Sequence, residues 1–214
     1  MDTNKNFVIT ISREVGSGGR TIGRKLAEKL GVRYCDKDLI NKLVDCFGLS
    51  VGSIERIKGE KKNWLADALQ RFSPDPHAAA AGLPKRELRP GVTSDDVFAV
   101  ESALLRKLAD EGSCVIAGRS GFFVLKDHPN KIDIFIHASK PRRIERVMER
   151  QGKTREEAVE IISNVDEMRE NFVQRFAGVS RYDARNYDLV LNVDGLDTDA
   201  AVELILRFIE KSRG

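Results

Sequence analysis

The chain has 214 residues, enough for one domain with a sizeable hydrophobic core. Its 36 basic and 33 acidic residues leave a net charge of +3, a balance that argues against nucleic acid or an anionic membrane surface as the main partner. No apolar run approaches the roughly 20 residues of a membrane span, and the N-terminus lacks the apolar stretch of a signal peptide. The three cysteines are isolated, so we expect reduced thiols in a cytoplasmic protein and no zinc site.

Short apolar runs alternate along the chain with helical patterns. The runs are nearly continuous in apolar residues, as expected of strands that helices cover on both faces. Helical spacing appears in 19–30, 95–111 and 197–211, the last behind a cap at Asp197. This alternation predicts an α/β fold with a five-stranded, parallel, doubly wound sheet, in which ligands bind at the carboxyl ends of the strands. The predicted strands are 7–12, 32–35, 114–118, 132–138 and 187–193.

A glycine-rich segment, "EVGSGGRT", joins the first predicted strand to the first predicted helix. It is similar to a phosphate-binding loop, except that Glu14 replaces the first glycine and Arg20 replaces the lysine. Glycines permit close backbone approach, a helix N-terminus and an arginine attract phosphate, and Thr21 supplies a hydroxyl for magnesium. The alternative is a tight turn without a ligand. The predicted nucleotide-binding residues are Gly16, Ser17, Gly18, Gly19, Arg20 and Thr21, with Thr21 as the metal ligand.

Charged residues also follow the second and third predicted strands. Asp36 and Asp38 lie where a carboxylate would face the ligand crevice and hold a magnesium-bound water or a substrate hydroxyl. The alternative for Asp36 is a helix N-cap. Arg119 directly follows the third strand, which predicts contact with a ligand phosphate rather than a place in a surface turn.

Residues 140–175 are predicted to form two helices after the fourth strand. Arg143, Arg146 and Arg150 recur at i, i+3 and i+7, so they share one helical face. A solvated stripe paired with glutamates is the alternative, but a basic helix at this point of the chain is also where a closing lid would lie. We therefore predict a helical lid here.

The second of these helices begins at a capping box of Thr154 and Glu157. A helical wheel places Arg169 inside its apolar arc and Asp166 on the shoulder of that arc. An inward-facing arginine is costly unless it meets an anion. The two interpretations are a buried Asp166–Arg169 pair, or an arginine aimed at a phosphate with Asp166 orienting it or reading the substrate.

Residues 48–94 interrupt the alternation of strands and helices. This stretch holds prolines, an alanine run and two charge clusters, with one plausible helix around 53–72. We predict a mobile, acceptor-side excursion within a single domain that spans 1–214.

Together these segments resemble the cytidylate kinase-like branch of the nucleoside monophosphate kinases, a group of P-loop NTPases, from residue 7 to about 211. "VIAGRSG" is similar to their Gly-Arg-Asp-x-Gly segment, and residues 166–169 match their Asp-x-x-Arg motif. The resemblance implies Mg²⁺ and ATP as the phosphoryl donor and a phosphate-bearing acceptor, CMP or dCMP first. It implies catalytic roles for Arg20, Arg143, Arg146 and Arg169, and substrate binding by Asp36, Asp38, Arg119, Asp166 and Arg169.

The sequence departs from that family at three positions. Arg20 replaces the loop lysine, Ser120 replaces the aspartate after Arg119, and Ile162 occupies the place of a further arginine. One alternative is therefore a small-molecule kinase of the shikimate-kinase type, because the segment Asp36-Lys37-Asp38 would suit a hydroxylated acceptor. Another is a nucleotide-binding sensor that hydrolyses little. In each case we expect nucleotide ligands, no nucleic acid and no membrane, with a homodimer left as a candidate.

Overall fold

The structure, a computed structural model, describes residues 1–36 and 94–212. The chain divides into two compact units, one formed by 1–36 and 105–214 and the other by 37–104. The sheet and the candidate site belong to the first unit. Asp38, the helix near 53–72 and nearly all of the predicted excursion lie outside the described residues, so these expectations and that of a single domain stay predictions.

A five-stranded sheet with the order β2-β3-β1-β4-β5 confirms the predicted strands. Every neighbouring pair is parallel, with Ile9 opposite both Val115 and Ile132. The first strand is therefore the central one, and it leads directly into the glycine-rich loop. The bounds are β1 Val8–Arg13, β2 Arg33–Cys35, β3 Cys114–Ala117, β4 Lys131–His137 and β5 Leu189–Asn192.

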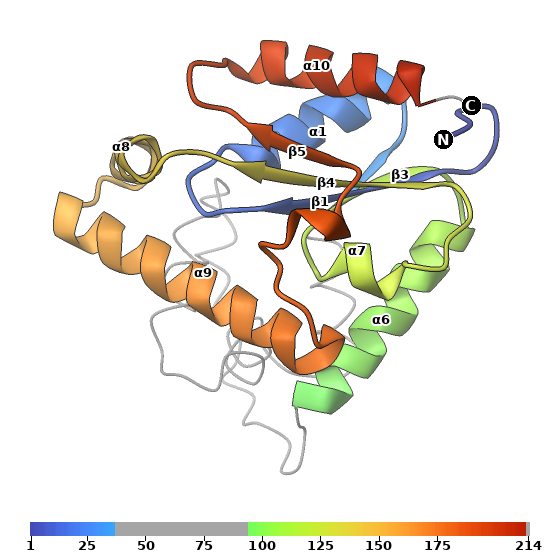
Figure 1. Ribbon diagram of the computed structural model, residues 1–214, viewed down its shortest axis with the longest axis horizontal. Coiled ribbons are helices and arrows are strands. Elements are labelled where there is room, and N and C mark those ends of the chain that lie inside the picture. Colours follow the sequence, from blue (N-terminus) through green and yellow to red (C-terminus); the bar gives the residue numbers. More distant parts are fainter. Residues whose placement is uncertain (37–93, 213–214) are drawn as a thin grey trace, which may run out of the picture. The chain divides into compact units, whose positions relative to one another are not determined.

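Helices cover both faces of the sheet, with α1 and α10 on one side and α7 and α9 on the other (Figure 1). The predicted caps are confirmed. Asp197 accepts a hydrogen bond from the Ala200 amide at 2.7 Å, and Thr154 and Glu157 form a capping box. None of the described helices is long and apolar enough to cross a membrane. The bounds are α1 Gly19–Leu30, α6 Ser94–Asp110, α7 Gly121–Val124, α8 Lys140–Gln151, α9 Arg155–Ala177, η1 Ala184–Asn186 and α10 Thr198–Lys211.

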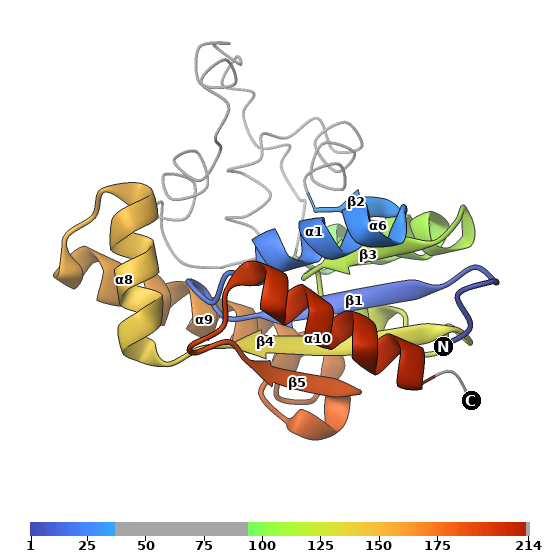
Figure 2. The ribbon, with the colours of Figure 1, turned by 90° about the horizontal axis from the view of Figure 1, so that it is seen from above.

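The central strand is anchored by the core between the sheet and the α1–α10 face. Ile9 and Ile11 have no exposed surface, and they belong to one buried cluster with Leu26 of α1 and Ile205 of α10. Burying each such side chain contributes roughly 1.5–3 kcal/mol. The loop that follows β1 therefore starts from a fixed strand end. Figure 2 shows α8 beyond the carboxyl end of β4, on the side of the sheet where the loop lies.

Candidate phosphate-binding site

The glycine-rich loop turns the chain from β1 into α1. Gly16 and Gly18 adopt left-handed backbone angles, with φ of 79° and 84°, which glycine tolerates without strain. A Cβ on Gly16 would lie 2.6 Å from the carbonyl oxygen of Arg143, and one on Gly19 would lie 2.7 Å from Cβ of Arg13. The glycines are thus needed for the turn, for the close approach of the loop to α8, and for the close approach of α1 to the end of β1.

Two arginines of α8 bind the backbone carbonyls of the loop from outside. Nε of Arg143 donates to the Val15 carbonyl at 2.7 Å, and Nη1 of Arg146 donates to the Ser17 carbonyl at 2.6 Å. The third arginine of this helical face, Arg150, lies 3.4 Å from the Thr21 hydroxyl. The three arginines therefore share one face of α8, as predicted, and this face contacts the loop along its length.

These contacts fix the direction of two loop peptides. A trans peptide points its N–H away from its carbonyl, so the amides of Gly16 and Gly18 face the side opposite the arginines. Neither amide has an acceptor among the residues that the structure describes. Together with the amides of the first turn of α1, they form a set of donors arranged for an anion.

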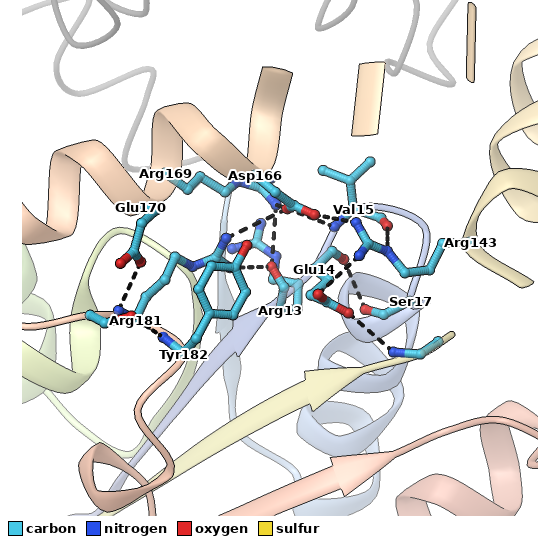
Figure 3. Close-up of polar contacts among 12 residues, drawn as sticks. Arg13, Glu14, Val15, Ser17, Arg143, Asp166, Arg169, Glu170, Arg181 and Tyr182 are labelled. Atoms are coloured by element: carbon cyan, nitrogen blue, oxygen red, sulfur yellow. Dashed lines mark hydrogen bonds and ion pairs between the residues drawn. The ribbon is translucent and has the colours of Figure 1, made fainter. Parts of the chain in front are cut away.

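Asp166 of α9 is the carboxylate on which this arrangement depends (Figure 3). It is buried and accepts a hydrogen bond from the Val15 amide at 3.1 Å and one from Nη2 of Arg143. Its Oδ1 also lies 3.5 Å from Nη1 of Arg181 and 3.7 Å from Nη1 of Arg169. One carboxylate thus holds the loop backbone and three guanidinium groups together.

The wheel prediction for α9 had the two charged residues in the wrong order of burial. Asp166 is the buried one, and the Arg169 side chain is 32% exposed. Asp166 can be buried because arginines from outside α9 neutralise it, which a pattern within one helix does not reveal. The Asp166–Arg169 pair itself is present, and a further role of Arg169 toward a phosphate stays a prediction.

Arg181 is a site residue that sequence reasoning missed. Its side chain is 4% exposed, and its Nη2 donates to the Arg13 carbonyl at 2.6 Å. Its backbone amide donates to Glu170 at 3.0 Å, and its carbonyl accepts a hydrogen bond from Tyr187. It lies between α9 and η1, where no helical or strand periodicity marks it as a buried residue.

Glu14 was noted only as a departure from the loop pattern, and the structure gives that departure a reason. Its carboxylate pairs with Nη1 of Arg143 at 2.9 Å and accepts a hydrogen bond from the Ala138 amide at 3.3 Å. The Ser17 hydroxyl donates to the Glu14 carbonyl at 2.9 Å. Glu14 therefore ties the loop to α8 and to the end of β4.

On the other side of the loop, Arg20 contacts the end of β2. Its Nε donates to the buried carboxylate of Asp36, and its carbonyl accepts a hydrogen bond from the Tyr34 hydroxyl at 3.2 Å. Burial raises the pKa of Tyr34 to about 12. The structure thus brings Asp36 to the loop as the sequence predicted. The Arg20 side chain keeps 39% exposure, which leaves part of the guanidinium open to solvent.

The end of β3 carries an unusual backbone. Gly118, Arg119 and Ser120 all have positive φ, of 79°, 60° and 54°, although only the first is a glycine. Left-handed non-glycine residues cost about 1–3 kcal/mol each and cluster at functional sites. The contact of Arg119 with a ligand stays a prediction.

A cleft of about 460 Å³ lies between α8 and the segment that leads into α10. Arg146 connects it to the loop, and burial, together with Arg142 and Arg150, lowers the pKa of Arg146. The described residues hold no group of three or more metal-ligating side chains. The Thr21 hydroxyl still fits magnesium, which usually takes few protein ligands and completes its shell with phosphate oxygens and water. The lining residues are Arg142, Arg146, Glu149, Arg150, Gly195, Leu196, Asp197 and Thr198.

Comparison with known proteins places this geometry among kinases. The model of the cytidylate kinase-like family matches residues 8–195. The cytidylate kinase of Archaeoglobus fulgidus is 25% identical over 208 residues, which cover 94% of this chain and 94% of that protein. The cytidylate kinase of Methanopyrus kandleri is 25% identical over 213 residues, which cover 96% of this chain and 94% of that protein.

Solved structures share the fold. An uncharacterised protein from Eubacterium ventriosum has a TM-score of 0.69 at 25% identity, with 97% of this chain and all of that chain (100%) covered. A gluconokinase from Sinorhizobium meliloti has a TM-score of 0.56 at 15% identity and covers 96% of this chain and 93% of its own. A shikimate kinase from Bacteroides thetaiotaomicron has a TM-score of 0.54 at 15% identity, with coverages of 96% and 99%. At these identities the two named kinases inform the fold alone.

Proposed function

The chain belongs to the cytidylate kinase-like family, and on that premise we propose that it transfers the γ-phosphoryl group of Mg-ATP to a nucleoside monophosphate, with CMP or dCMP as the first candidates. The geometry of the glycine-rich loop is the main support for this proposal. Its carbonyls are held outward by Arg143 and Arg146, and the amides of Gly16 and Gly18 are left for an anion. Phosphoryl transfer needs positioning and charge neutralisation more than covalent help, and such a loop supplies both.

The donor would place its phosphates in the loop and its remaining part in the cleft beside α8. That cleft begins at Arg146, whose guanidinium already touches the loop, and its volume of about 460 Å³ suits a small-molecule ligand. Arg20 would supply the charge that lysine gives in related loops. Its partial exposure supports this role, because part of its fork can still reach a phosphate, and Asp36 is its one ion-pair partner among the described residues.

Magnesium, when bound with the nucleotide, would neutralise charge on the phosphate oxygens. Thr21 is the residue of this chain that we assign to it. Arg150 lies 3.4 Å from the Thr21 hydroxyl. It would either orient this hydroxyl or move away from it when the nucleotide and magnesium bind.

We divide the remaining arginines by their contacts. Arg143 is buried and uses its guanidinium on Glu14, Val15 and Asp166, which supports a role in holding the loop. Arg146 is less buried and lines the cleft, which supports contact with the donor.

On the acceptor side we assign Asp36, Arg119, Asp166 and Arg169, with Asp38 retained from the sequence. Arg119 follows β3 in a strained backbone, and Arg169 contacts the buried carboxylate with a side chain that is 32% exposed. These positions support the proposed substrate roles.

A coupled assay of ADP release tests the proposal. The purified chain with Mg-ATP is offered CMP, dCMP, UMP, AMP and GMP, and separately shikimate and gluconate. We expect acceptor-dependent ADP release with a cytidine monophosphate first. Release with shikimate or gluconate alone would replace the nucleotide acceptor by a small hydroxylated one. Tight ATP binding without transfer to any acceptor would favour a sensor.

A further inference from the structure

The side chain of Arg13 does not join the arginine network that holds the loop. Its carbonyl binds Arg181 and Arg169, but its guanidinium lies against the carboxyl ends of two other strands. Nη2 is 3.9 Å from Oδ1 of Asp36 at the end of β2. At the end of β3, a Cβ on Gly118 would lie only 1.8 Å from Nη1, so the absence of a side chain at Gly118 makes room for this guanidinium.

The charge and the N–H donors of the Arg13 guanidinium have few partners among the described residues. The side chain is 17% exposed, and among the described residues it makes one ion pair and no hydrogen bond. That pair is long, and the same carboxylate, Asp36, already accepts a hydrogen bond from Arg20. Burial lowers the pKa of Arg13, and repulsion from Arg119 and Arg20 acts in the same direction. An arginine has five N–H donors, and burying them without acceptors is costly.

The position of Arg13 separates it from the donor cleft. In the sheet order β2-β3-β1-β4-β5, its guanidinium reaches from β1 over β3 toward β2. The cleft lies instead by α8 and the connection from β5 to α10. An anion held by Arg13 would therefore lie beside Arg119, on the far side of the loop from the cleft.

We propose that Arg13 is a binding residue for the phosphate of the phosphoryl acceptor, which it shares with Arg119. This inference rests on the proposed function, and it names a further binding residue for the acceptor side. Asp36 holds Arg13 and Arg20 at the crevice when no phosphate is present. When the substrate binds, its phosphate dianion supplies the hydrogen-bond acceptors that the Arg13 guanidinium lacks among the described residues.

Calorimetric titration with CMP, cytidine and ATP tests this on the wild type, Arg13→Met and Arg13→Lys. Methionine keeps much of the apolar stem and removes the charge, and the backbone carbonyl that binds Arg181 is unchanged. Lysine keeps the charge without the fork and provides a second variant if the first is unstable. Arg207→Met removes an exposed arginine of α10 and serves as the matched control. Melting temperatures of all variants are measured in parallel.

We expect Arg13→Met to weaken CMP binding roughly 10- to 100-fold, toward the affinity of cytidine, with ATP affinity within about twofold of the wild type. Arg13→Lys should lie between, and Arg207→Met should match the wild type. Unchanged CMP affinity in Arg13→Met, or equal losses for CMP, cytidine and ATP, would overturn the inference. Wild-type protein that binds CMP through Arg13 but releases no ADP would refute the proposed transfer and leave the phosphate-binding role of Arg13 standing.

Discussion

Arg169 and Arg181 contact the same two acceptors, the Arg13 carbonyl and Oδ1 of Asp166, but their side chains differ in burial. Arg181 reaches the carbonyl at 2.6 Å with a side chain that is 4% exposed, and Arg169 reaches it at 3.2 Å with 32% exposed. The two arginines thus form a matched pair. Arg181 has the geometry of a structural partner, and the Arg169 side chain is partly exposed.

Replacing each of them by methionine should separate stability from activity. We expect Arg181→Met to lower the free energy of unfolding by about 2–3 kcal/mol, because charged hydrogen bonds in a buried position are lost. Arg169→Met should cost under about 1 kcal/mol, since the side chain is partly solvated, and should reduce turnover roughly 10³-fold if it meets a phosphate. Urea unfolding and steady-state kinetics measure both. A stable Arg181→Met, or near-normal turnover in Arg169→Met, would contradict this division.

Asp166→Asn tests the carboxylate that joins the loop to α8 and α9. The amide keeps the shape but removes one of the two carboxylates that pair with the buried Arg143 and, among the described residues, the one that pairs with the buried Arg181, so we expect a loss of roughly 3–5 kcal/mol in the free energy of unfolding. Asp199→Asn is the control, because Asp199 makes only an exposed ion pair with Lys25 and should change stability by under about 0.5 kcal/mol. Equal stabilities of the two variants in urea would show that the carboxylate is not needed.

Substitutions of Arg20 and Thr21 test whether the loop binds the nucleotide. Arg20→Ala should abolish turnover and weaken ATP binding. Arg20→Lys should retain part of the activity, because the charge survives and the planar fork is lost. Thr21→Ala should raise the magnesium concentration that half-maximal rate requires. Full activity of Arg20→Ala, or an unchanged magnesium titration for Thr21→Ala, would remove the residue concerned from the site.

The pKa values of two partly buried tyrosines predict how the stability of the fold changes at alkaline pH. Burial raises the pKa of both Tyr34 and Tyr187 to about 12, against about 10 in the unfolded chain. Between pH 10 and 12 the unfolded state has released protons that the folded state retains. Stability should therefore be complete below pH 10 and fall by about 1.4 kcal/mol per pH unit for each tyrosine above it.

The measurement is denaturant unfolding from pH 9 to 11.5, together with ultraviolet titration of the phenols. Tyr34→Phe and Tyr187→Phe should each flatten the slope, and both are compared in a Tyr182→Phe background because burial also raises the pKa of Tyr182. Tyrosines that titrate near pH 10 in the folded protein would contradict the assigned burial.

The fold and the loop could be predicted because local patterns determine them. The five apolar runs become the five strands, and the caps at Asp197 and Thr154 act through residues three positions away. The glycines of the loop follow from backbone conformation alone. Each of these features depends on neighbours in the sequence.

The contacts that organise the site depend on residues far apart in the chain, and there the sequence was insufficient. Glu14 looked like a defect in the loop, but its partner is Arg143 of α8. Arg181 lies in an aperiodic segment, yet its side chain returns to the end of β1. The wheel that ranked Arg169 above Asp166 in burial had no information on the arginines that neutralise the aspartate.

Phosphorus NMR of a mixture of the wild-type chain, Mg-ATP and CMP tests the central claim most directly. We expect the γ-phosphate resonance of ATP to decline while the resonances of ADP and CDP grow in equal amounts. With Arg20→Ala in place of the wild type, the spectrum should stay unchanged. Release of inorganic phosphate without CDP, or no change in wild-type protein with CMP and every other nucleoside monophosphate, would contradict it.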